Sequence, residues 1–217
     1  WHPGTMGGPA ITELLFGEEC PSGKLPVTFP RTVGQIPLYY GQKNTGRPAS
    51  EESFVDINQI ETKAPQTSLG MTSTHLDTHY SPLFPFGFGL SYTQFEYKNI
   101  NVNEYCIPMG ASLKIEATIT NTGNFNAEEV VQLYIRDLVG SVTRPVKELK
   151  GFKRLFLPAG KSETIAFTLH TDELAFYDRQ MDFKTEPGLF NVWIGGNSDT
   201  ELKTEFEVFC PEHEAKI

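Results

Sequence analysis

Apolar residues at every second position constrain the fold of this chain more than any other feature. Leu113, Ile115, Ala117 and Ile119 alternate with polar residues. The same period recurs in three further segments, at Val131, Leu133 and Ile135, at Ile165, Phe167 and Leu169, and at Phe190, Val192 and Ile194. This pattern is typical of strands with one buried face. With turn residues at 121–124, 157–161 and 186–188, about seven strands predict an antiparallel sandwich of immunoglobulin or fibronectin type III shape over residues 91–217.

The first 41 residues predict a different kind of structure. Residues 9–16 have a proline near the start and Gly17 just past the end, which is typical of a helix. Residues 25–30 predict a short strand, which its prolines confine to a sheet edge. These two elements are too few to bury their own apolar faces. We therefore expect residues 1–41 to complete an α/β domain that begins upstream, and the start at Trp1 without Met or leader fits this expectation.

Residues 42–90 read as an irregular linker. The segment from Gln42 is rich in Thr, Ser, Asn and Gln and has no sustained period, so we expect a tether between domains. A thin set of apolar residues would anchor it to a neighbouring surface: Phe54, Val55, Ile57, Ile60, Leu69 and Met71. Residues 80–90 add aromatic rings between prolines and glycines. They favour a buried junction between domains over a platform on which ligands stack.

Charge and composition exclude several classes of partner. The chain has 18 basic and 27 acidic residues, a balance of 18 − 27 = −9, without a basic cluster, which argues against nucleic acid. It has no apolar run of about 20 residues, so no membrane partner is expected. The cysteines and histidines lack the spacing of a metal site. The glycines of residues 4–8 match no nucleotide motif, so no cofactor is predicted.

Candidate reactive residues are sparse. Hydrolysis by paired carboxylates needs two of them about 5–10 Å apart in a shielded cleft. Glu13, Glu18 and Glu19 lie near the glycine turn, but we expect them on a solvated helix face and in the turn that follows. Trp193 and Tyr134 point away from the apolar face of their strands. Such rings stack on sugars or, more often, pack against a neighbouring domain.

Three motifs resemble one enzyme family. Residues 1–11 (WHPGTMGGPAI) and 15–31 (LFGEECPSGKLPVTFPR) are similar to the end of the second domain of glycoside hydrolase family 3, the β-glucosidase and β-xylosidase family. Residues 82–93 (PLFPFGFGLSYT) resemble its junction into the C-terminal domain, and 143–152 (TRPVKELKGF) a signature of its fibronectin III-like domain. The turn departs from the family, which commonly has Asp and Asn where Glu18 and Cys20 stand.

The resemblance implies a catalytic centre outside this chain. Family members carry an aspartate nucleophile on an N-terminal (β/α)8 barrel and an acid/base glutamate on the α/β sandwich domain, and they retain anomeric configuration through a glycosyl-enzyme intermediate. Both motifs lie upstream of Trp1, so no catalytic residue is expected here. Trp1, His2 and Met6 are the candidates for the substrate cleft, because open α/β sheets meet ligands at such turns. We expect them to support residues that bind substrate.

The resemblance also suggests a location, and the expected sandwich topology suggests a disulfide. Family members are usually periplasmic or secreted, where disulfides form. Cys106 follows the first sandwich strand and Cys210 ends the last one, at the same pole of an immunoglobulin-like topology. We therefore predict a Cys106–Cys210 disulfide, with Cys20 reduced.

These observations favour one function and leave others open. The chain is read as the C-terminal portion of a β-glucosidase that removes terminal non-reducing β-D-glucosyl residues, inactive alone. Alternatives are a β-xylosidase parent, a stand-alone carbohydrate- or protein-binding module, and a structural spacer. Expected partners are the upstream barrel and α/β domains and a β-glucoside or oligosaccharide; a second copy of the chain is a further candidate. The sugar and linkage are not specified, because the family's subsites lie mainly upstream.

Overall fold

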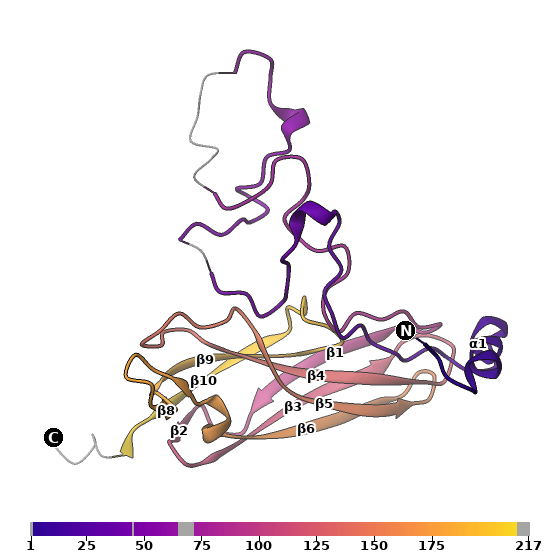
Figure 1. The fold of residues 1–217 in the computed structure, drawn as a ribbon. Helices are drawn as coiled ribbons and strands as arrows, with labels where there is room; N and C mark the ends of the chain where they lie inside the picture. The colour runs from indigo at the N-terminus through magenta and orange to yellow at the C-terminus, as the bar shows by residue number, and fades with distance from the viewer. Residues whose placement is uncertain (1, 45, 65–71, 212–217) are drawn as a thin grey trace.

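Two regions make up the fold in the computed structural model, which describes residues 2–44, 46–64 and 72–211. A β-sandwich occupies the C-terminal part, and a mostly irregular N-terminal arm (described residues 2–44, 46–64 and 72–90) leads into it. Figure 1 shows the sandwich lying below the arm, with α1 standing apart at one end. The mostly β fold class predicted from the alternating pattern is confirmed.

Two sheets form the sandwich. The smaller has the order β1 (Phe95–Val102), β3 (Ser112–Asn121) and β6 (Ser162–His170). The larger has the order β2 (Cys106–Pro108), β10 (Lys203–Phe209), β9 (Gly188–Gly195), β4 (Ala127–Asp137) and β5 (Glu148–Leu157). Neighbours pair antiparallel except β10 and β2, which are parallel. This parallel pair is the one departure from the predicted antiparallel arrangement.

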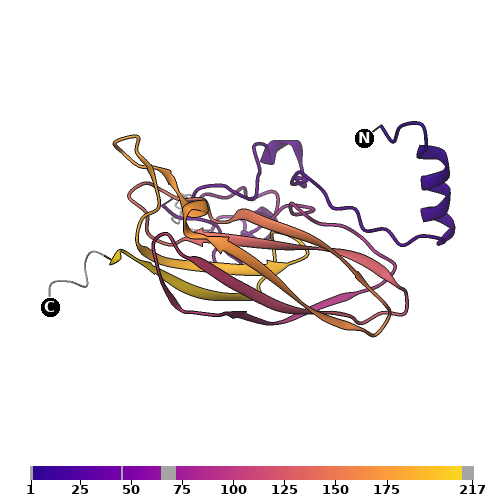
Figure 2. The ribbon, with the colours of Figure 1, turned by 90° about the horizontal axis from the view of Figure 1, so that it is seen from below.

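A hairpin and a short helix complete the sandwich. The turn η4 (Thr171–Leu174) follows β6 and leads into the hairpin of β7 (Phe176–Tyr177) and β8 (Phe183–Lys184). Figure 2 shows this hairpin at the opposite end of the sandwich from α1. The guanidinium of Arg144 lies 3.9 Å from the ring centroid of Phe176, which joins the hairpin to the loop between β4 and β5.

The core lies between the two sheets. Apolar residues that the two-residue period places inward meet there, because each sheet turns alternate side chains to one face. Leu113, Ile115, Ala117, Ile119 and Val131 are all inaccessible to solvent. Phe190 and Phe206 stack within this core with ring centroids 5.3 Å apart. The described residues of this core thus all come from the sandwich.

The arm contains little regular structure. The helix α1 (Gly7–Phe16) ends at Gly17, whose left-handed φ of 76° suits glycine, as the sequence predicts. Short 3-10 turns follow at η1 (Val33–Gln35) and η2 (Ile57–Gln59). The predicted strand at 25–30 is an extended segment with one bridge, between Phe29 and Phe84. Residues 47–57 pair with 73–76, so the linker folds back on itself as it rises from the sandwich (Figure 1).

Candidate functional site

The arm meets the sandwich on the outer face of β4 and β9. Residues 25–29 and 84–88 run side by side, and the amides of Leu25 and Gly87 donate at 2.8 Å to the carbonyls of Phe88 and Leu25 respectively. The Ser198 amide in the turn after β9 donates to the Phe86 carbonyl at 2.9 Å. The aromatic segment 80–90, which we predicted to form a junction, therefore lies on the outer face of the larger sheet.

Gln132 of β4 is the centre of this junction. Its Nε2 donates to the carbonyl of Gly87 at 3.2 Å and to that of Gly196 at 2.6 Å, while its Oε1 accepts the Tyr134 hydroxyl. Gly87 has a φ of 78°, and a Cβ there would lie 2.1 Å from Gln132 Oε1. Both the backbone conformation and the close approach require glycine at this position.

A buried ion pair lies beside Gln132. Lys24 Nζ in the arm lies 2.9 and 3.1 Å from the two carboxylate oxygens of Glu129 on β4, whose side chain is 4% exposed. The Tyr97 hydroxyl on β1 donates to Glu129 Oε1 at 2.7 Å. Burial, and then the neighbouring carboxylate, raise the pKa of Tyr97 well above its usual range. Removing either partner would leave a buried charge unpaired.

Aromatic rings cover the rest of the junction. Tyr40 stacks on Phe86 at 4.3 Å between centroids and meets the edge of Tyr134 at 5.8 Å. Trp193 is 9% exposed, and Lys147 Nζ lies 4.8 Å from its ring centroid. Of the two alternatives for Trp193 and Tyr134, packing therefore applies: Tyr134 packs against Tyr40 of the arm, and Trp193 packs against Lys147 of the sandwich.

The segment 143–152 positions Lys147. Arg144 donates to Glu148 at 3.0 Å and Lys43 of the arm forms a bridge with Pro145. Lys147 Nζ donates to the carbonyls of Ser198 at 2.7 Å and Thr200 at 2.8 Å. Burial lowers the pKa of Lys147 to about 8, against the opposing effect of nearby acidic residues.

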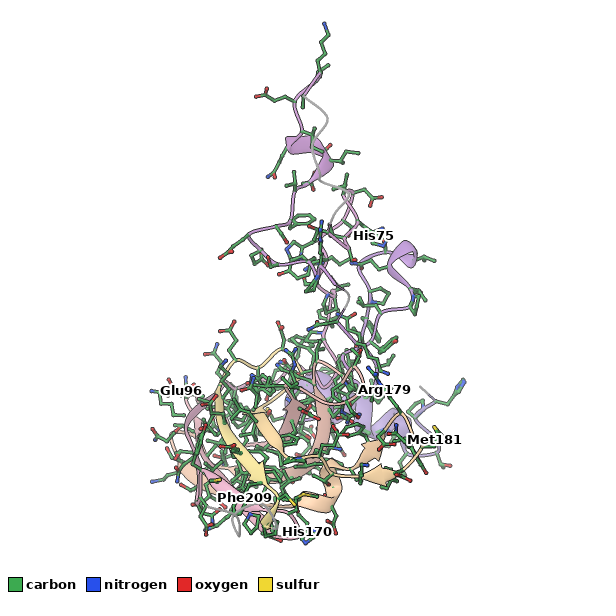
Figure 3. The ribbon with its side chains drawn as sticks, turned by 90° about the vertical axis from the view of Figure 1, so that its left-hand side faces the viewer. His75, Glu96, His170, Arg179, Met181 and Phe209 are labelled. Atoms are coloured by element: carbon green, nitrogen blue, oxygen red, sulfur yellow. The ribbon has the colours of Figure 1, made fainter. Side chains whose placement is uncertain are left out.

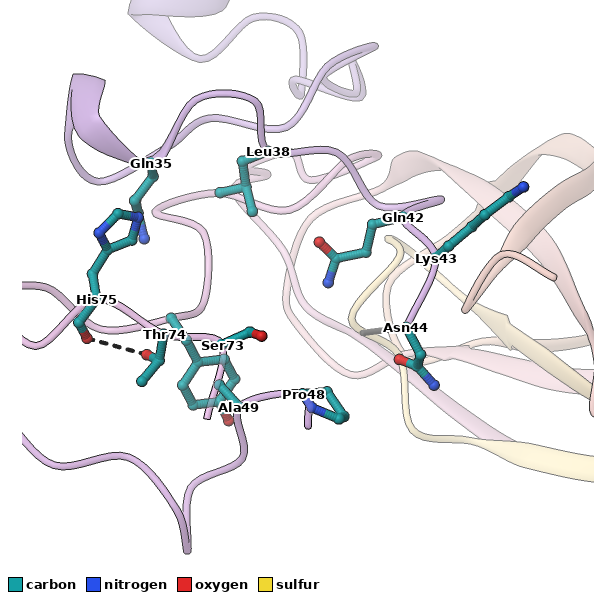
Figure 4. A pocket seen from close by; sticks show the side chains of 11 residues that line it. Gln35, Leu38, Gln42, Lys43, Asn44, Pro48, Ala49, Ser73, Thr74 and His75 are labelled. Atoms are coloured by element: carbon teal, nitrogen blue, oxygen red, sulfur yellow. Dashed lines mark hydrogen bonds between the residues drawn. The ribbon is translucent and has the colours of Figure 1, made fainter. Parts of the chain in front are cut away.

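Two of the hollows near the junction share part of their lining. The junction hollow, of about 350 Å³, lies between the arm and the sheet and is lined in part by Tyr39, Arg136, Lys147, Trp193 and Asp199. The arm hollow, of about 310 Å³, lies within the arm (Figure 4) and is lined in part by Asn44, Pro48, Ser73 and His75. Leu38, Gln42 and Tyr80 line both.

The predicted cleft residues lie elsewhere. Trp1 falls outside the described residues, while His2 is exposed and Met6 is 68% exposed. They precede α1, whose apolar side chains face solvent, among them Leu15 at 74% and Phe16 at 81%. Nothing in the structure joins His2 and Met6 to either hollow. Their role at a substrate cleft stays a prediction that concerns surfaces outside this chain.

The acidic and metal-binding candidates do not gather into a site. Glu13, Glu18 and Glu19 are exposed, so no shielded carboxylate pair forms around the glycine turn. Histidines are also dispersed: Figure 3 shows His75 in the arm and His170 at the far side of the sandwich. Among the described residues, no three His, Cys, Asp or Glu side chains come together as metal ligands.

The predicted Cys106–Cys210 disulfide is wrong. Cys106 and Cys210 are not joined in the structure. The parallel register places Cys106 beside Glu207, three positions before Cys210 on the chain. At about 3.3 Å per strand residue the two cysteines lie about 10 Å apart, beyond the reach of a disulfide. The shared pole was predicted correctly, but the parallel register was not foreseen. Cys20 lies 3.1 Å from the Ser91 hydroxyl.

The arm also contains a polar relay that its sequence did not predict. The Ser81 hydroxyl lies 2.7 Å from His79 Nδ1, and His79 Nε2 lies 3.2 Å from Glu51, in the order of a hydrolytic triad. However, His79 Nδ1 also accepts the Ser81 amide at 3.2 Å, and the Glu51 side chain is 75% exposed. The relay therefore closes a turn of the arm. Glu51 is 28 residues from His79, so no local pattern indicated it.

Comparisons with known proteins match both regions. The profile of the glycosyl hydrolase family 3 C-terminal domain matches residues 1–92, and that of the fibronectin type III-like domain matches 129–198. The chain is 39% identical to a periplasmic β-glucosidase of Salmonella typhimurium, covering 96% of this chain and 25% of that protein. It is 38% identical to a putative β-xylosidase of Formosa agariphila, covering 96% and 24%.

Solved structures agree. The crystal structure of β-glucosidase from Listeria innocua in complex with glucose has a TM-score of 0.82 and 39% identity, over 96% of this chain and 27% of that one. The chain thus spans about a quarter of the length of these relatives. None of the helices formed by the described residues has the length and apolar character needed to span a bilayer.

Proposed function

Because the chain belongs to glycoside hydrolase family 3, we propose that it forms the C-terminal part of a retaining exo-β-glycosidase, a β-glucosidase that removes terminal non-reducing β-D-glucosyl residues. This proposal rests on one observation: the region that matches the family's C-terminal domain and the region that matches the fibronectin type III-like domain are connected within one chain. A self-contained sandwich is fixed, through a buried junction, to an arm whose helix presents an unburied apolar face.

Within that enzyme the chain supports and connects domains. We assign residues 1–41 to the end of the α/β domain, 42–90 to the tether and 91–217 to the fibronectin type III-like domain. The exposed face of α1 would pack on the upstream part of the α/β domain, since apolar side chains such as Phe16 gain most by leaving water. The carboxylates of the reaction would come from upstream, so this chain alone is inactive.

Activity measurements on the intact protein and on the isolated chain test the proposal. The intact protein should hydrolyse 4-nitrophenyl β-D-glucoside and release β-glucose first, as proton NMR would show for a double displacement. The isolated chain should give the background rate. Initial release of α-glucose would contradict the retaining mechanism. Turnover by the isolated chain that is lost on changing Glu13, Glu18 or Glu19 would contradict the upstream placement of the chemistry.

A β-xylosidase is the second candidate, because the putative β-xylosidase of Formosa agariphila is nearly as similar to this chain as the Salmonella β-glucosidase. The substrates of the two candidates differ in one group, because a β-glucoside carries a hydroxymethyl group on its sugar ring and a β-xyloside does not. We expect kcat/KM of the intact protein to favour the aryl β-glucoside over the aryl β-xyloside at least tenfold, and the reverse preference would select the second candidate. The name of the Salmonella relative also supports a periplasmic location, which cell fractionation would test.

A further inference from the structure

The junction hollow and the arm hollow together form a groove whose chemistry suits one class of ligand. They share Leu38, Gln42 and Tyr80, so they adjoin along the line where the arm crosses the sheet. Each hollow, at about 350 and 310 Å³, lies at the small end of the range found for ligand sites, roughly 300–1,000 Å³. The groove therefore has room for a small ligand in each half.

The junction hollow combines ring faces with charges of both signs. Tyr39 is 57% exposed at its wall, and Trp193 lies beneath Lys147. Arg136 and Asp199 also line it, and neither side chain has a hydrogen bond or ion pair with another described residue. A donor group and an acceptor group are thus available at the same hollow. An anionic ligand would meet Asp199, and a cationic one would meet Arg136 and Lys147.

The arm hollow offers uncharged polar groups. In Figure 4 the side chains of Leu38 and Gln42 point into the space from one side and Ser73 faces it from another, while Lys43 points away. The Gln42 carbonyl accepts the Val146 amide at 2.9 Å, which fixes this residue to the sandwich. Its side-chain amide forms no hydrogen bond with any described residue. Gln42 therefore presents a donor and an acceptor at the boundary of the two hollows.

We propose that this groove binds a neutral saccharide of two rings, one in each hollow. Sugar hydroxyls both donate and accept, so they match amides, a hydroxyl and an Arg–Asp combination better than any ion does. The less polar face of a pyranose ring suits the exposed Tyr39 ring. The choice of a saccharide over another neutral polyol rests on the proposed glycosidase function. Among the described residues that line the two hollows Asp199 is the one carboxylate, so the groove lacks the carboxylate pair that hydrolysis needs.

Binding of cellobiose to the 217-residue chain tests the proposal, because the catalytic cleft is expected upstream. Saturation-transfer NMR and calorimetry should show saturable binding in the millimolar range. Tyr39→Ala should weaken it at least tenfold, whereas Tyr177→Ala, at a tyrosine 59% exposed on the distant hairpin, should leave it unchanged. Gln42→Ala should weaken it similarly, and Gln180→Ala, also exposed on the hairpin, should not. Thermal unfolding of each variant checks that it remains folded.

The outcomes separate this inference from the proposed function. Absence of saturable binding, or equal effects of the Tyr39 and Tyr177 variants, would overturn the saccharide groove even if the intact protein hydrolyses β-glucosides. Conversely, cellobiose binding that depends on Tyr39 and Gln42 would support the groove even if the intact protein failed to hydrolyse any β-glycoside. Sorbitol has similar hydroxyls but no ring, so binding as tight as that of cellobiose would also contradict the proposal.

Discussion

The sandwich and the arm keep their shapes by different interactions. In the sandwich, two sheets close over side chains such as Leu113 and Val131, which are fully buried. In the arm, Phe16 is 81% and Val33 is 84% exposed. The arm is held by backbone hydrogen bonds, by polar contacts at Gln132 and Glu129, and by the Tyr40 ring at the junction. One sequence can thus contain a region with its own core beside a region whose apolar side chains would be buried only against another part of the protein.

The largest expected effect comes from replacing a phenylalanine by alanine in the sandwich, and the same replacement in the arm is its comparison. Phe206→Ala removes a ring that is 0% exposed and stacks on Phe190, so it should lower the free energy of unfolding by about 3–5 kcal/mol. Phe16→Ala should change it by less than about 0.5 kcal/mol in this chain, because that ring already faces solvent. Urea denaturation measures both. Similar losses at the two sites would break the comparison.

The Phe16→Ala variant also sharpens the comparison in the intact protein. If upstream residues cover α1, Phe16→Ala should then cost about 3 kcal/mol or more, as for a buried ring. An unchanged stability of the intact protein would mean that the apolar face of α1 stays exposed there too.

The next effect concerns the ion pair that joins the two regions. Lys24→Met leaves the buried Glu129 carboxylate without its cation and should destabilise the chain by about 3 kcal/mol. Lys98→Met is the matched control, because Lys98 pairs with Glu96 at 2.8 Å on the surface with side chains 62% and 46% exposed. Its loss should cost less than about 1 kcal/mol. Equal losses in urea denaturation would show that the junction pair is as screened as the surface pair.

A smaller effect compares two glycines with similar backbone conformations. Gly110 in the sandwich has a φ of 85° and open space around its Cβ position, so Gly110→Ala should cost about 1 kcal/mol from backbone strain alone. Gly87→Ala adds a contact of 2.1 Å with Gln132, whose amide is held by other hydrogen bonds, and should cost about 2–3 kcal/mol. Equal costs would indicate that Gln132 moves aside freely.

These contrasts explain how much the sequence could predict. Leu113 to Ile119 identified a buried face from spacing alone, because a strand's period is local. Gly17 marked the end of α1 for the same reason. The two-residue period also predicted that Tyr134 and Trp193 point outward. It gave no indication that Tyr40 and Lys147 would cover them. Those contacts join residues far apart in the chain, and no local pattern encodes them.

The candidate groove was hidden for a related reason. Its Tyr39 and Gln42 come from one segment of the arm and its Asp199 from the turn after β9, and each segment reads locally as a turn or as irregular chain. The Cys106–Cys210 pairing failed because the choice between parallel and antiparallel neighbours for β2 depends on the whole sheet. Placing two residues at one pole is easier than placing them within disulfide distance.

The smallest expected effect tests whether the arm excludes water from Lys147 and so lowers its pKa. Burial lowers the Lys147 pKa to about 8 in the folded chain from a usual value of 10.5. Between pH 8 and 10.5 the unfolded chain therefore holds more protons, so the contribution of Lys147 to stability rises with pH in this window and is constant below it. Because the side chain is partly hydrated, we expect a gain of about 1 kcal/mol or less relative to Lys147→Met, measured by urea denaturation at pH 7.5 and 9.5.

Carbon-13 NMR of the lysine Cε groups should show Lys147 titrating near pH 8, and Tyr40→Ala, which opens the arm's cover over the junction, should move that midpoint upward. A midpoint that stays near 8 in this variant would assign the desolvation to Trp193 and the turn at Ser198, both within the sandwich. The arm would then rest on a surface that is already dry without it. A midpoint that rises toward 10.5 would mean that the two regions, although held together by different interactions, exclude water jointly.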